Sequence, residues 1–340
     1  MMRKKLVSIV LPAHNESGNI DIISERIDSC FPHDHYDLEV IFVDDGSTDD
    51  TLQKIENLQN RNSRIFYIEL SRNFGHQSAL KAGLDFANGD CIISMDCDLQ
   101  HPPEIISKLL EKWDEGFDIV YTRREENENL SFLKRKTSNA FYNLVSWLSD
   151  IKIEKGTSDF RLIDRKVADV FSRFKENDLF IRGLMKWVGF KQVAIDFHPD
   201  DRHSGCSKYT FRKMVSFAFN GITSLSIRPL YLAVYLGFTL SLLSFLYLPY
   251  VVWSYYFSGH YSYGWGSVIL TVVFFSGLQL SVLGIIGIYI GKMFMQVKDR
   301  PVYIVKATSL KSEMLPKNLH FEKYKNASKT LIHQNASNIS

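Results

Sequence analysis

The sequence predicts an α/β fold in which a mostly parallel sheet carries helices on both faces and is followed by interfacial helices and two transmembrane helices. In the first 120 residues, short apolar runs rich in Val and Ile alternate with segments of helical spacing. Such alternation is typical of a parallel sheet whose strands are joined by helices. Two later runs, 230–253 and 266–291, contain no Asp, Glu, Lys, Arg or His. Each is longer than the roughly 20 residues that cross a bilayer as a helix.

The elements of the first half can be placed in order. Strands are expected at 5–13, 37–45, 64–70 and 91–98, and helices between them at 18–31, 51–61 and 75–87. In the first helix, Ile20, Ile23 and Ile27 recur at the spacing of one buried face. After residue 120 the pattern loosens, and the segment 159–174 is expected to form a strand edge that leads into a helix.

Polar clusters follow the four predicted strands. In chain order they read PAHNE, DDGSTDD, SRNFGHQ and DCDLQ. Because ligands of parallel sheets collect at the carboxyl ends of the strands, we expect these four segments to surround one site.

The fourth cluster predicts a divalent metal. On a strand, Asp96 and Asp98 would point to the same side while Cys97 points back, and Gln100 adds a neutral oxygen nearby. Two carboxylates this close repel each other unless a positive partner lies between them. This set of hard oxygen ligands suits Mg²⁺ or Mn²⁺ rather than zinc. A lone Asp-x-Asp is weak evidence, but one that follows DDGSTD at the second strand end is strong.

The second cluster favours a nucleotide. A turn sequence, Gly-Ser-Thr-Asp at 46–49, can make a tight turn and cap the next helix. An ordinary turn explains those residues but not the two carboxylates, Asp44 and Asp45, at the strand end. One of them can accept hydrogen bonds from a base or a ribose.

The distribution of charge orients the two predicted spans. The aromatic loop between them carries no Lys or Arg, whereas basic residues flank both outer ends, so the positive-inside rule puts the long flanks in the cytoplasm. We therefore expect a multi-pass protein of the cell membrane with both termini cytoplasmic. Its expected parts are a cytoplasmic domain at 1–208, interfacial amphipathic helices at 209–229, spans at 230–253 and 266–291, an extracytoplasmic loop at 254–265 and a cytoplasmic basic tail at 292–340.

Composition argues against other classes. The net charge is only +2, and no basic stripe with interleaved aromatic residues occurs, so a nucleic-acid partner is not expected. The four cysteines lack Cys-x-x-Cys spacing and are expected to be free thiols: Cys30, Cys91, Cys97 and Cys206.

Several motifs in a fixed order resemble one family. They are VSIVLPAHNE, VDDGSTDDT, LSRNFGHQSAL, MDCDLQHPPE, GTSDFRLIDRKV and HSGCSKY, followed by the two spans and VKDRPVYIV. Over about residues 5 to 305 the chain is similar to the polyisoprenyl-phosphate glycosyltransferases of glycosyltransferase family 2. The resemblance implies a Rossmann-like fold of the GT-A type. It also implies inverting transfer of one sugar from a nucleotide diphosphate sugar to polyprenyl (undecaprenyl) phosphate at the cytoplasmic membrane face. UDP-glucose is the first choice of donor, then UDP-GlcNAc, then GDP-mannose.

The resemblance further implies roles for single residues. Those near the nucleotide sugar are Pro12, Asn15, Glu16, Asp44, Asp45, Asp96, Arg123, Arg202 and Lys208. The metal set is Asp96, Asp98 and Gln100, and the catalytic set is Asp159, Arg161 and Asp96. Residues near the acceptor phosphate are Arg135, Ser138, Ser207, Lys208 and Tyr209. Cys97, His101 and Cys206 stand where the family often has Ala, Asp and Glu, so the loop contacts around Cys206 depart from the family pattern.

The part played by Asp159 stays open at this stage. In the usual account it is the base. A phosphate monoester has a second pKa of about 6 and is already mostly dianionic at neutral pH, so Asp159 could instead orient the acceptor or the sugar hydroxyls. For His76 and His101, helix capping or hydrogen bonding is expected rather than metal ligation.

Two rival functions are less favoured. A processive polysaccharide synthase would carry a Gln-x-x-Arg-Trp signature and more spans, which this sequence lacks. A non-catalytic membrane scaffold would be expected to have lost the metal carboxylates, which are present. Homo-oligomerisation through the membrane hairpin or the C-terminal tail stays open.

Overall fold

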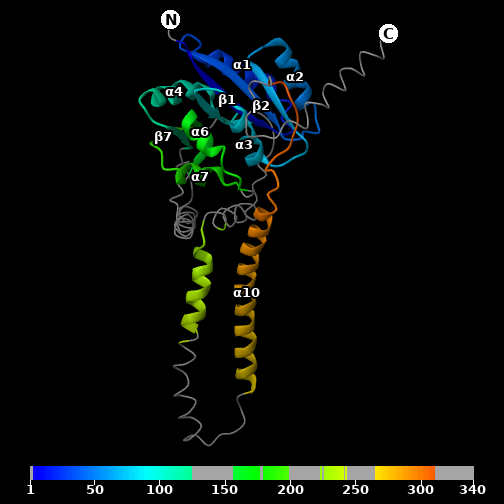
Figure 1. Cartoon of the computed structure of the whole chain (residues 1–340), viewed down its shortest axis with the longest axis vertical. Coiled ribbons are helices and arrows are strands. Elements are labelled where there is room, and N and C mark those ends of the chain that lie inside the picture. Colours follow the sequence, from blue (N-terminus) through cyan, green and yellow to red (C-terminus); the bar gives the residue numbers. More distant parts are fainter. Residues whose placement is uncertain are drawn as a thin grey trace, which may run out of the picture.

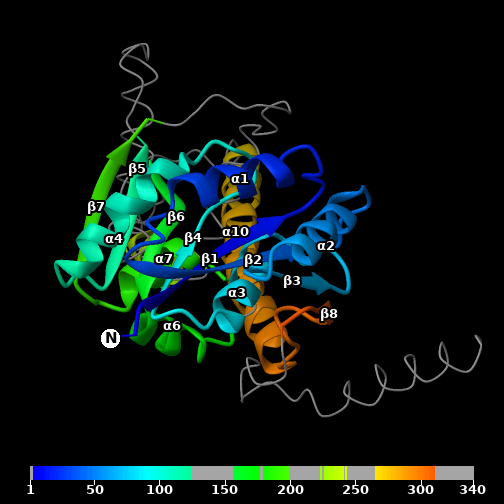
Figure 2. The same ribbon diagram turned by 90° about the horizontal axis from the view of Figure 1, so that it is seen from above.

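The computed structural model describes residues 3–124, 156–176, 179–198, 223, 226–240, 242 and 265–310. Within these ranges an eight-stranded sheet has the strand order β7-β5-β6-β4-β1-β2-β3-β8 (Figure 2). The strands are β1 (Lys5–Ala13), β2 (Tyr36–Asp44), β3 (Ile65–Leu70), β4 (Cys91–Ser94), β5 (Ile119–Arg124), β6 (Thr157–Asp164), β7 (Gln192–Phe197) and β8 (Val305–Thr308).

Helices cover both faces of this sheet, as the sequence predicts. They are α1 (Ile20–Cys30), α2 (Thr51–Arg61), α3 (His76–Phe86), α4 (Ile106–Asp114), α6 (Arg165–Phe171) and α7 (Ile181–Trp187). A further long helix, α10 (Trp265–Val297), lies away from the sheet (Figure 1). Buried residues of α1, α2 and α4 share one apolar core, and those of α3, α6 and α7 share the core on the opposite face. Along β1, Ile9 and Leu11 belong to the first core and Val10 to the second, which is the alternation of a strand buried on both faces.

The direction of β6 decides where the site forms. Strands β4, β1, β2 and β3 are mutually parallel, so the polar clusters that follow them lie along one edge. Strand β6 runs antiparallel to β4, and Ser94 at the end of β4 is paired with Arg161 in the middle of β6, so residues 157–160 extend past that end. The first residues of β6 are therefore brought to the carboxyl edge of the parallel strands.

The prediction that Asp96 and Asp98 lie on a strand is wrong. Strand β4 ends at Ser94, and both aspartates lie in the turn that follows. Leu99 has a φ of 62°, in the left-handed region that an extended strand does not use. Cys97 is nevertheless 2% exposed, while both aspartates are half-buried. The turn therefore buries Cys97 and leaves the two aspartates more accessible, as was expected of a strand.

The C-terminal segment adds an edge strand that the sequence did not predict. Strand β8 pairs antiparallel with β3, with Thr308 opposite Ile68. The backbone N–H of Ser71 donates to the carbonyl of Ile304 at 2.9 Å, and the Tyr303 hydroxyl donates to Asp85 of α3 at 2.9 Å. The chain that follows α10 is thus part of the sheet domain.

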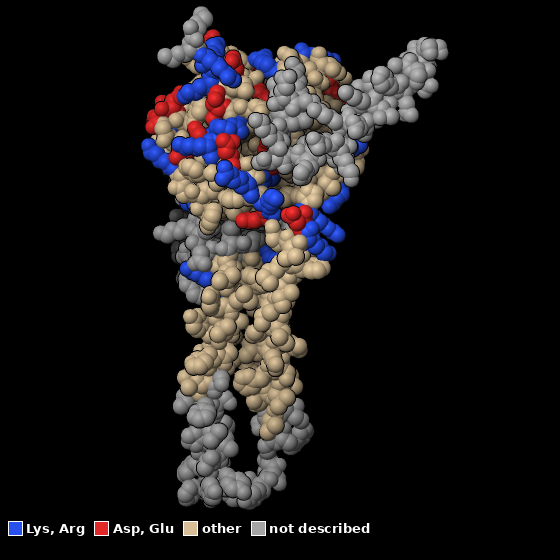
Figure 3. Space-filling model, viewed as in Figure 1, with Lys and Arg blue, Asp and Glu red and all other residues tan. Residues whose placement is uncertain are grey.

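Helix α10 forms an apolar stem below the domain (Figures 1 and 3). Its segment Thr271–Val297 has a mean hydropathy of 2.0 with no residue buried, so its length and composition allow it to cross a membrane. Residues 228–240 are also helical and carry exposed apolar side chains, but most of the first predicted span and nearly all of the predicted interfacial helices at 209–229 lie outside the described residues.

Candidate active site

A buried histidine connects the turn after β4 to the start of β6. The backbone N–H of Asp96 donates to Nδ1 of His101 at 3.1 Å, and Nε2 of His101 lies 2.6 Å from Oγ of Ser158. Because Nδ1 accepts, Nε2 carries the proton and donates to Ser158. Burial lowers the pKa of His101 despite the nearby charges of Asp96 and Asp98, which keeps the ring neutral. As expected from the sequence, His101 is a hydrogen-bond partner.

Asp159 is the most heavily paired carboxylate of the edge. Nε and Nη2 of Arg182 each lie 2.9 Å from one of its oxygens, and Nη2 of Arg161 lies 3.3 Å from Oδ1. The Asp159 side chain is only 5% exposed. Burial by itself raises the pKa of this carboxyl, but Arg182, His76 and Arg161 outweigh it and hold the pKa well below its usual range. Asp159 is therefore an ionised group inside a cationic cluster.

His76, the first residue of α3, lies between two carboxylates. Its Nε2 is 3.4 Å from Oδ1 of Asp96 and 3.7 Å from Oδ2 of Asp159. Burial lowers its pKa, but hydrogen bonding to Asp159 and the charges of Asp96 and Asp159 raise the pKa to about 9. The imidazolium thus supplies a positive partner for both acids.

Two buried polar atoms of the described residues have no hydrogen-bond partner, Nε of Arg161 and Oδ1 of Asp44. The Arg161 side chain is 3% exposed, and burial lowers its pKa to about 10 although Asp159 opposes the shift. Its Nη2 donates to the carbonyl of Ser158 at 2.8 Å. An unpaired buried donor or acceptor is costly, so both atoms are candidates for contact with a ligand.

The neighbouring acids Asp44 and Asp45 have different partners. Oδ1 of Asp45 accepts from the backbone N–H of Phe74 at 2.7 Å, and Oδ2 accepts from that of Gly75 at 2.9 Å. Oδ2 of Asp44 accepts a 3.3 Å bond from the N–H of Ser47, whereas its Oδ1 has no partner. Burial raises the pKa of both carboxyls. Asp45 therefore holds the loop after β3, and Asp44 keeps an oxygen that a base or ribose could use.

The polar segment that follows β1 is hydrogen-bonded to the polar segment that follows β2. Asn15, with a φ of 57°, donates its N–H to Oγ of Ser47 at 3.0 Å, and its Oδ1 accepts from the N–H of Thr48 at 2.8 Å. The N–H of Glu16 donates to Oγ1 of Thr51 at 2.9 Å, while Pro12 is buried within β1. Asn15, through its backbone and its side chain, and Glu16, through its backbone, thus shape the predicted nucleotide loop.

The metal set offers a few hard oxygen atoms. The N–H of Gln100 donates to Oδ1 of Asp98 at 3.2 Å, and Oε1 of Gln100 accepts from Nη2 of Arg124 at 3.2 Å. Among the described residues, no group of three His, Cys, Asp or Glu side chains could hold a metal alone. Mg²⁺ ordinarily binds one or two carboxylates and takes its other ligands from water and substrate phosphates. Asp96, Asp98 and Gln100 fit that pattern, and the inward-pointing thiol of Cys97 gives no support for zinc.

Of the remaining predicted residues, the structure describes only Arg123, which it does not bring into this cluster. Arg123 pairs with Asp196 of β7 through contacts of 2.6 and 2.9 Å. The others lie outside the described residues: Arg135, Ser138, Arg202, Ser207, Lys208 and Tyr209. Cys30, Cys91 and Cys97 are free thiols as predicted, and Cys206 is also outside the described residues.

Sequence reasoning missed three polar groups of the site, Arg182, Arg124 and Ser158. Arg182 lies in FIRGLMKW, far along the chain from any predicted strand end. The resemblance did mark GTSDFRLID, in which Ser158 directly precedes Asp159. No local pattern indicated that Arg182 would fold back onto that segment.

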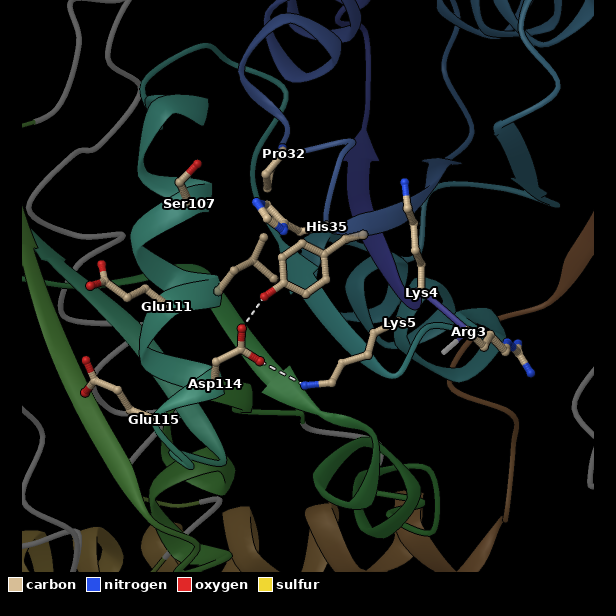
Figure 4. Close-up of a pocket in the computed structure, with 11 residues that line it drawn as sticks. Arg3, Lys4, Lys5, Pro32, His35, Ser107, Glu111, Asp114 and Glu115 are labelled. Carbon is tan, nitrogen blue, oxygen red and sulfur yellow. Dashed lines mark hydrogen bonds and ion pairs between the residues drawn. The ribbon is translucent and has the colours of Figure 1, made fainter. Parts of the chain in front are cut away.

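A separate groove of about 880 Å³ lies at the opposite edge of the sheet (Figure 4). Nζ of Lys5, at the start of β1, pairs with Asp114 at 2.8 Å, and the hydroxyl of Tyr36, at the start of β2, also donates to Asp114. The polar clusters follow the ends of these strands, so this groove is not part of the candidate site.

Comparison with known proteins finds relatives that cover most of the chain. The family described as glycosyl transferase family 2 matches residues 8–173. The glycosyltransferase YkcC of Bacillus subtilis is 41% identical over 94% of this chain and 99% of its own length. The bactoprenol glucosyl transferase of Shigella phage SfX is 35% identical over 88% of this chain and 99% of its own length.

Solved structures are more distant. The mannosyltransferase PcManGT of Pyrobaculum calidifontis is 17% identical, with 67% of this chain and 65% of that chain covered at a TM-score of 0.46, which is too loose a match to transfer a ligand. The curated relatives cover nearly the whole chain at 35–41% identity, and the protein therefore belongs to glycosyltransferase family 2 and is a glycosyltransferase.

Proposed function

We propose that the protein transfers one sugar, glucose from UDP-glucose in the first instance, to polyprenyl phosphate with inversion at the anomeric carbon. The observation that carries the proposal is the ionised Asp159, held by Arg182 and Arg161 and linked through His76 to Asp96 at the carboxyl edge of the sheet. Relatives named bactoprenol glucosyl transferase support a polyprenyl phosphate acceptor and glucose as the sugar.

Each group then has a defined part in the reaction. Asp44 would receive the base or ribose, and the cations around Asp159 would stabilise the charge on the departing nucleoside diphosphate. The acceptor phosphate is already mostly dianionic at neutral pH, with a second pKa of about 6. The partners of Asp159 hold it ionised, so it has little tendency to take a proton. Its part is to position the surrounding cations, which in turn orient the acceptor or the sugar.

A divalent cation belongs to the proposal. Asp96, Asp98 and Gln100 would hold Mg²⁺ or Mn²⁺. Such an ion supplies positive charge to the diphosphate and so stabilises the leaving group.

The membrane arrangement is also proposed. Helix α10 is long and apolar enough for one span, and residues 230–253 complete the predicted pair. The return of β8 to the sheet supports a common cytoplasmic side for the catalytic domain and the start of the 292–340 tail.

Membranes that contain the purified protein would be incubated with polyprenyl phosphate and labelled UDP-glucose, UDP-GlcNAc or GDP-mannose, with Mg²⁺, Mn²⁺ or EDTA. We expect a glucosylated lipid that depends on the metal, and a large loss of rate in Asp159→Asn with Mn²⁺ binding intact. Product with a different sugar would change the assigned donor. The absence of lipid-linked sugar under every condition would refute the function, and unchanged turnover in Asp159→Asn would remove that residue from the mechanism.

A further inference from the structure

A small aromatic surface lies on the catalytic domain beside the stem. Among the described residues between 3 and 198, Trp187 is the one large hydrophobic side chain that is exposed, at 66%. Its ring packs edge-on against Phe174 with the ring centroids 5.9 Å apart. The next residue, Lys175, accepts a 2.9 Å hydrogen bond at its carbonyl from Nε2 of Gln296 in α10. We call Trp187, Phe174 and Lys175 the stem-side patch.

The length of α10 indicates the depth of this patch in a bilayer. The charge-free run ends at Gly291 and is followed by Lys292. A hydrocarbon core about 30 Å thick takes up about 20 helical residues, which corresponds to the segment from Thr271 to about Gly291. Gln296 lies five residues further on, or roughly 8 Å at the helical rise. The contact with Lys175 therefore sets the stem-side patch at headgroup level.

Helix α7 connects this patch to the candidate active site. Arg182, near its start, holds Asp159, and Trp187 is its last residue. The two residues are separated by roughly 8 Å along the helix axis. In Figure 1, α7 lies on the side of the domain that faces the stem.

We propose that the stem-side patch is a bilayer anchor: Trp187 enters the headgroup layer and, through α7, fixes the height of Asp159 above the membrane. The proposal rests on the proposed transfer to a membrane lipid. Tryptophan is enriched at this depth because its ring is apolar and its N–H is polar. The cations Lys175, Lys298 and Arg300 outnumber the adjacent acids Glu176 and Asp299, which leaves a small net positive charge for anionic headgroups. Figure 3 shows Lys and Arg side chains, with Asp and Glu among them, where the domain meets the stem.

The depth of Trp187 can be measured directly. The full chain and its Trp187→Phe variant would be placed in vesicles of phosphatidylcholine and phosphatidylglycerol, with a spin label at the headgroup, at carbon 5 or at carbon 12 of the lipid. The fluorescence emission of Trp187 is obtained by subtracting the spectrum of the variant from that of the unchanged protein. We expect that difference to be quenched most by the headgroup and carbon-5 labels. Quenching by aqueous iodide but by no lipid label would overturn the proposal.

Trp113 provides a matched control. It is 8% exposed, and its Nε1 donates to Asp164 at 2.8 Å; it also lies over Lys5, at the opposite edge of the sheet. The emission lost in Trp113→Phe should be insensitive to every lipid label. Quenching of Trp113 like that of Trp187 would mean that the signal does not report the anchor, and would count against it.

Kinetics test the link to the site. Trp187→Ala should raise KM for polyprenyl phosphate about tenfold and leave KM for the nucleotide sugar unchanged, and Trp187→Phe should restore most of the loss. Equal changes in both KM values would indicate general damage and refute the link. The quenching result does not need turnover, so failure of the proposed reaction and failure of the anchor are separable.

Discussion

Arg182 holds Asp159 at two points, with Nε and Nη2 each 2.9 Å from a different carboxylate oxygen. A planar guanidinium matches a carboxylate in this geometry, which a lysine ammonium cannot reproduce. The contact fixes the orientation of Asp159 and keeps it ionised. It therefore favours an orienting role for Asp159 over that of a base.

The first prediction concerns this contact. Arg182→Ala should lower kcat by roughly 10² to 10³, the usual cost of losing a group that stabilises the transition state, and Arg182→Lys should retain part of the activity. Steady-state kinetics and Tm would be measured together. Arg165→Lys is the matched control, because Arg165 binds the carbonyls of Ala87 and Gly89 and should change Tm but not kcat. A wild-type kcat in Arg182→Ala would contradict the role.

The second prediction is a pH dependence of stability in metal-free protein. The pKa of His76 rises from an ordinary value of 6.5 to about 9 in the folded state. Protonated His76 therefore contributes stability that is fully present below about pH 6.5 and is lost as the pH rises through about 9. Tm in EDTA should be higher for the wild type than for His76→Gln at pH 6, and the gap should narrow by pH 10.

Asp159 has the opposite dependence. Its pKa is depressed, so its contribution is present above the usual carboxyl pKa of about 4 and is lost as the pH falls below it. The control for His76→Gln is His35→Gln, which removes an exposed imidazole far from the site. A gap for His76→Gln that stays constant from pH 6 to 10 would be inconsistent with the paired imidazolium.

The third prediction tests the link from Asp96 through His101 to Ser158. Ser158→Ala and His101→Asn should weaken Mn²⁺ binding by roughly 10- to 100-fold, as loss of groups that orient metal ligands usually does. Titration of Mn²⁺ followed by electron paramagnetic resonance would measure the affinity without turnover. His35→Asn serves as the control. Unchanged Mn²⁺ affinity in both variants would show that the turn after β4 does not need this support.

The fourth prediction separates the two neighbouring aspartates. Asp44→Asn should weaken UDP binding about tenfold, or about 1.4 kcal/mol, with little change in Tm. Asp45→Asn places an amide N–H against a backbone N–H of Phe74 or Gly75 and should mainly lower Tm. Calorimetric titration with UDP and thermal unfolding would distinguish them. The reverse assignment of effects would show that Asp45 contacts the nucleotide.

The features of the molecule that could be predicted from the sequence are those with a local sequence pattern. Strand β1 and helix α2 have their predicted bounds, because a buried run and a helical repeat are each read over about ten residues. Asp96 and Asp159 were placed in one site on their motifs. The turn at Leu99 was missed because the preceding apolar run continues through Met95 and hides the end of β4.

Contacts between residues far apart in the chain have no local sequence pattern and could not be predicted in this way. Arg182 reaches Asp159 across 23 residues, and its segment carries no metal, nucleotide or phosphate motif. Strand β8 is four residues long and pairs with a strand some 240 residues earlier. A short edge strand has too few positions to show a period, so only the folded chain reveals it.

The pairing of β8 with β3 limits the order in which parts of the protein can fold during its synthesis. The outer edge of β3 stays open until residues 305–308 leave the ribosome, and those residues follow α10 in the chain. The apolar helix must therefore be made before the catalytic sheet can close. A nascent chain that stops at residue 304 would expose the backbone of β3 as an open edge, which is prone to aggregation. Completion of the sheet thus marks a chain whose apolar helix α10 has already been made.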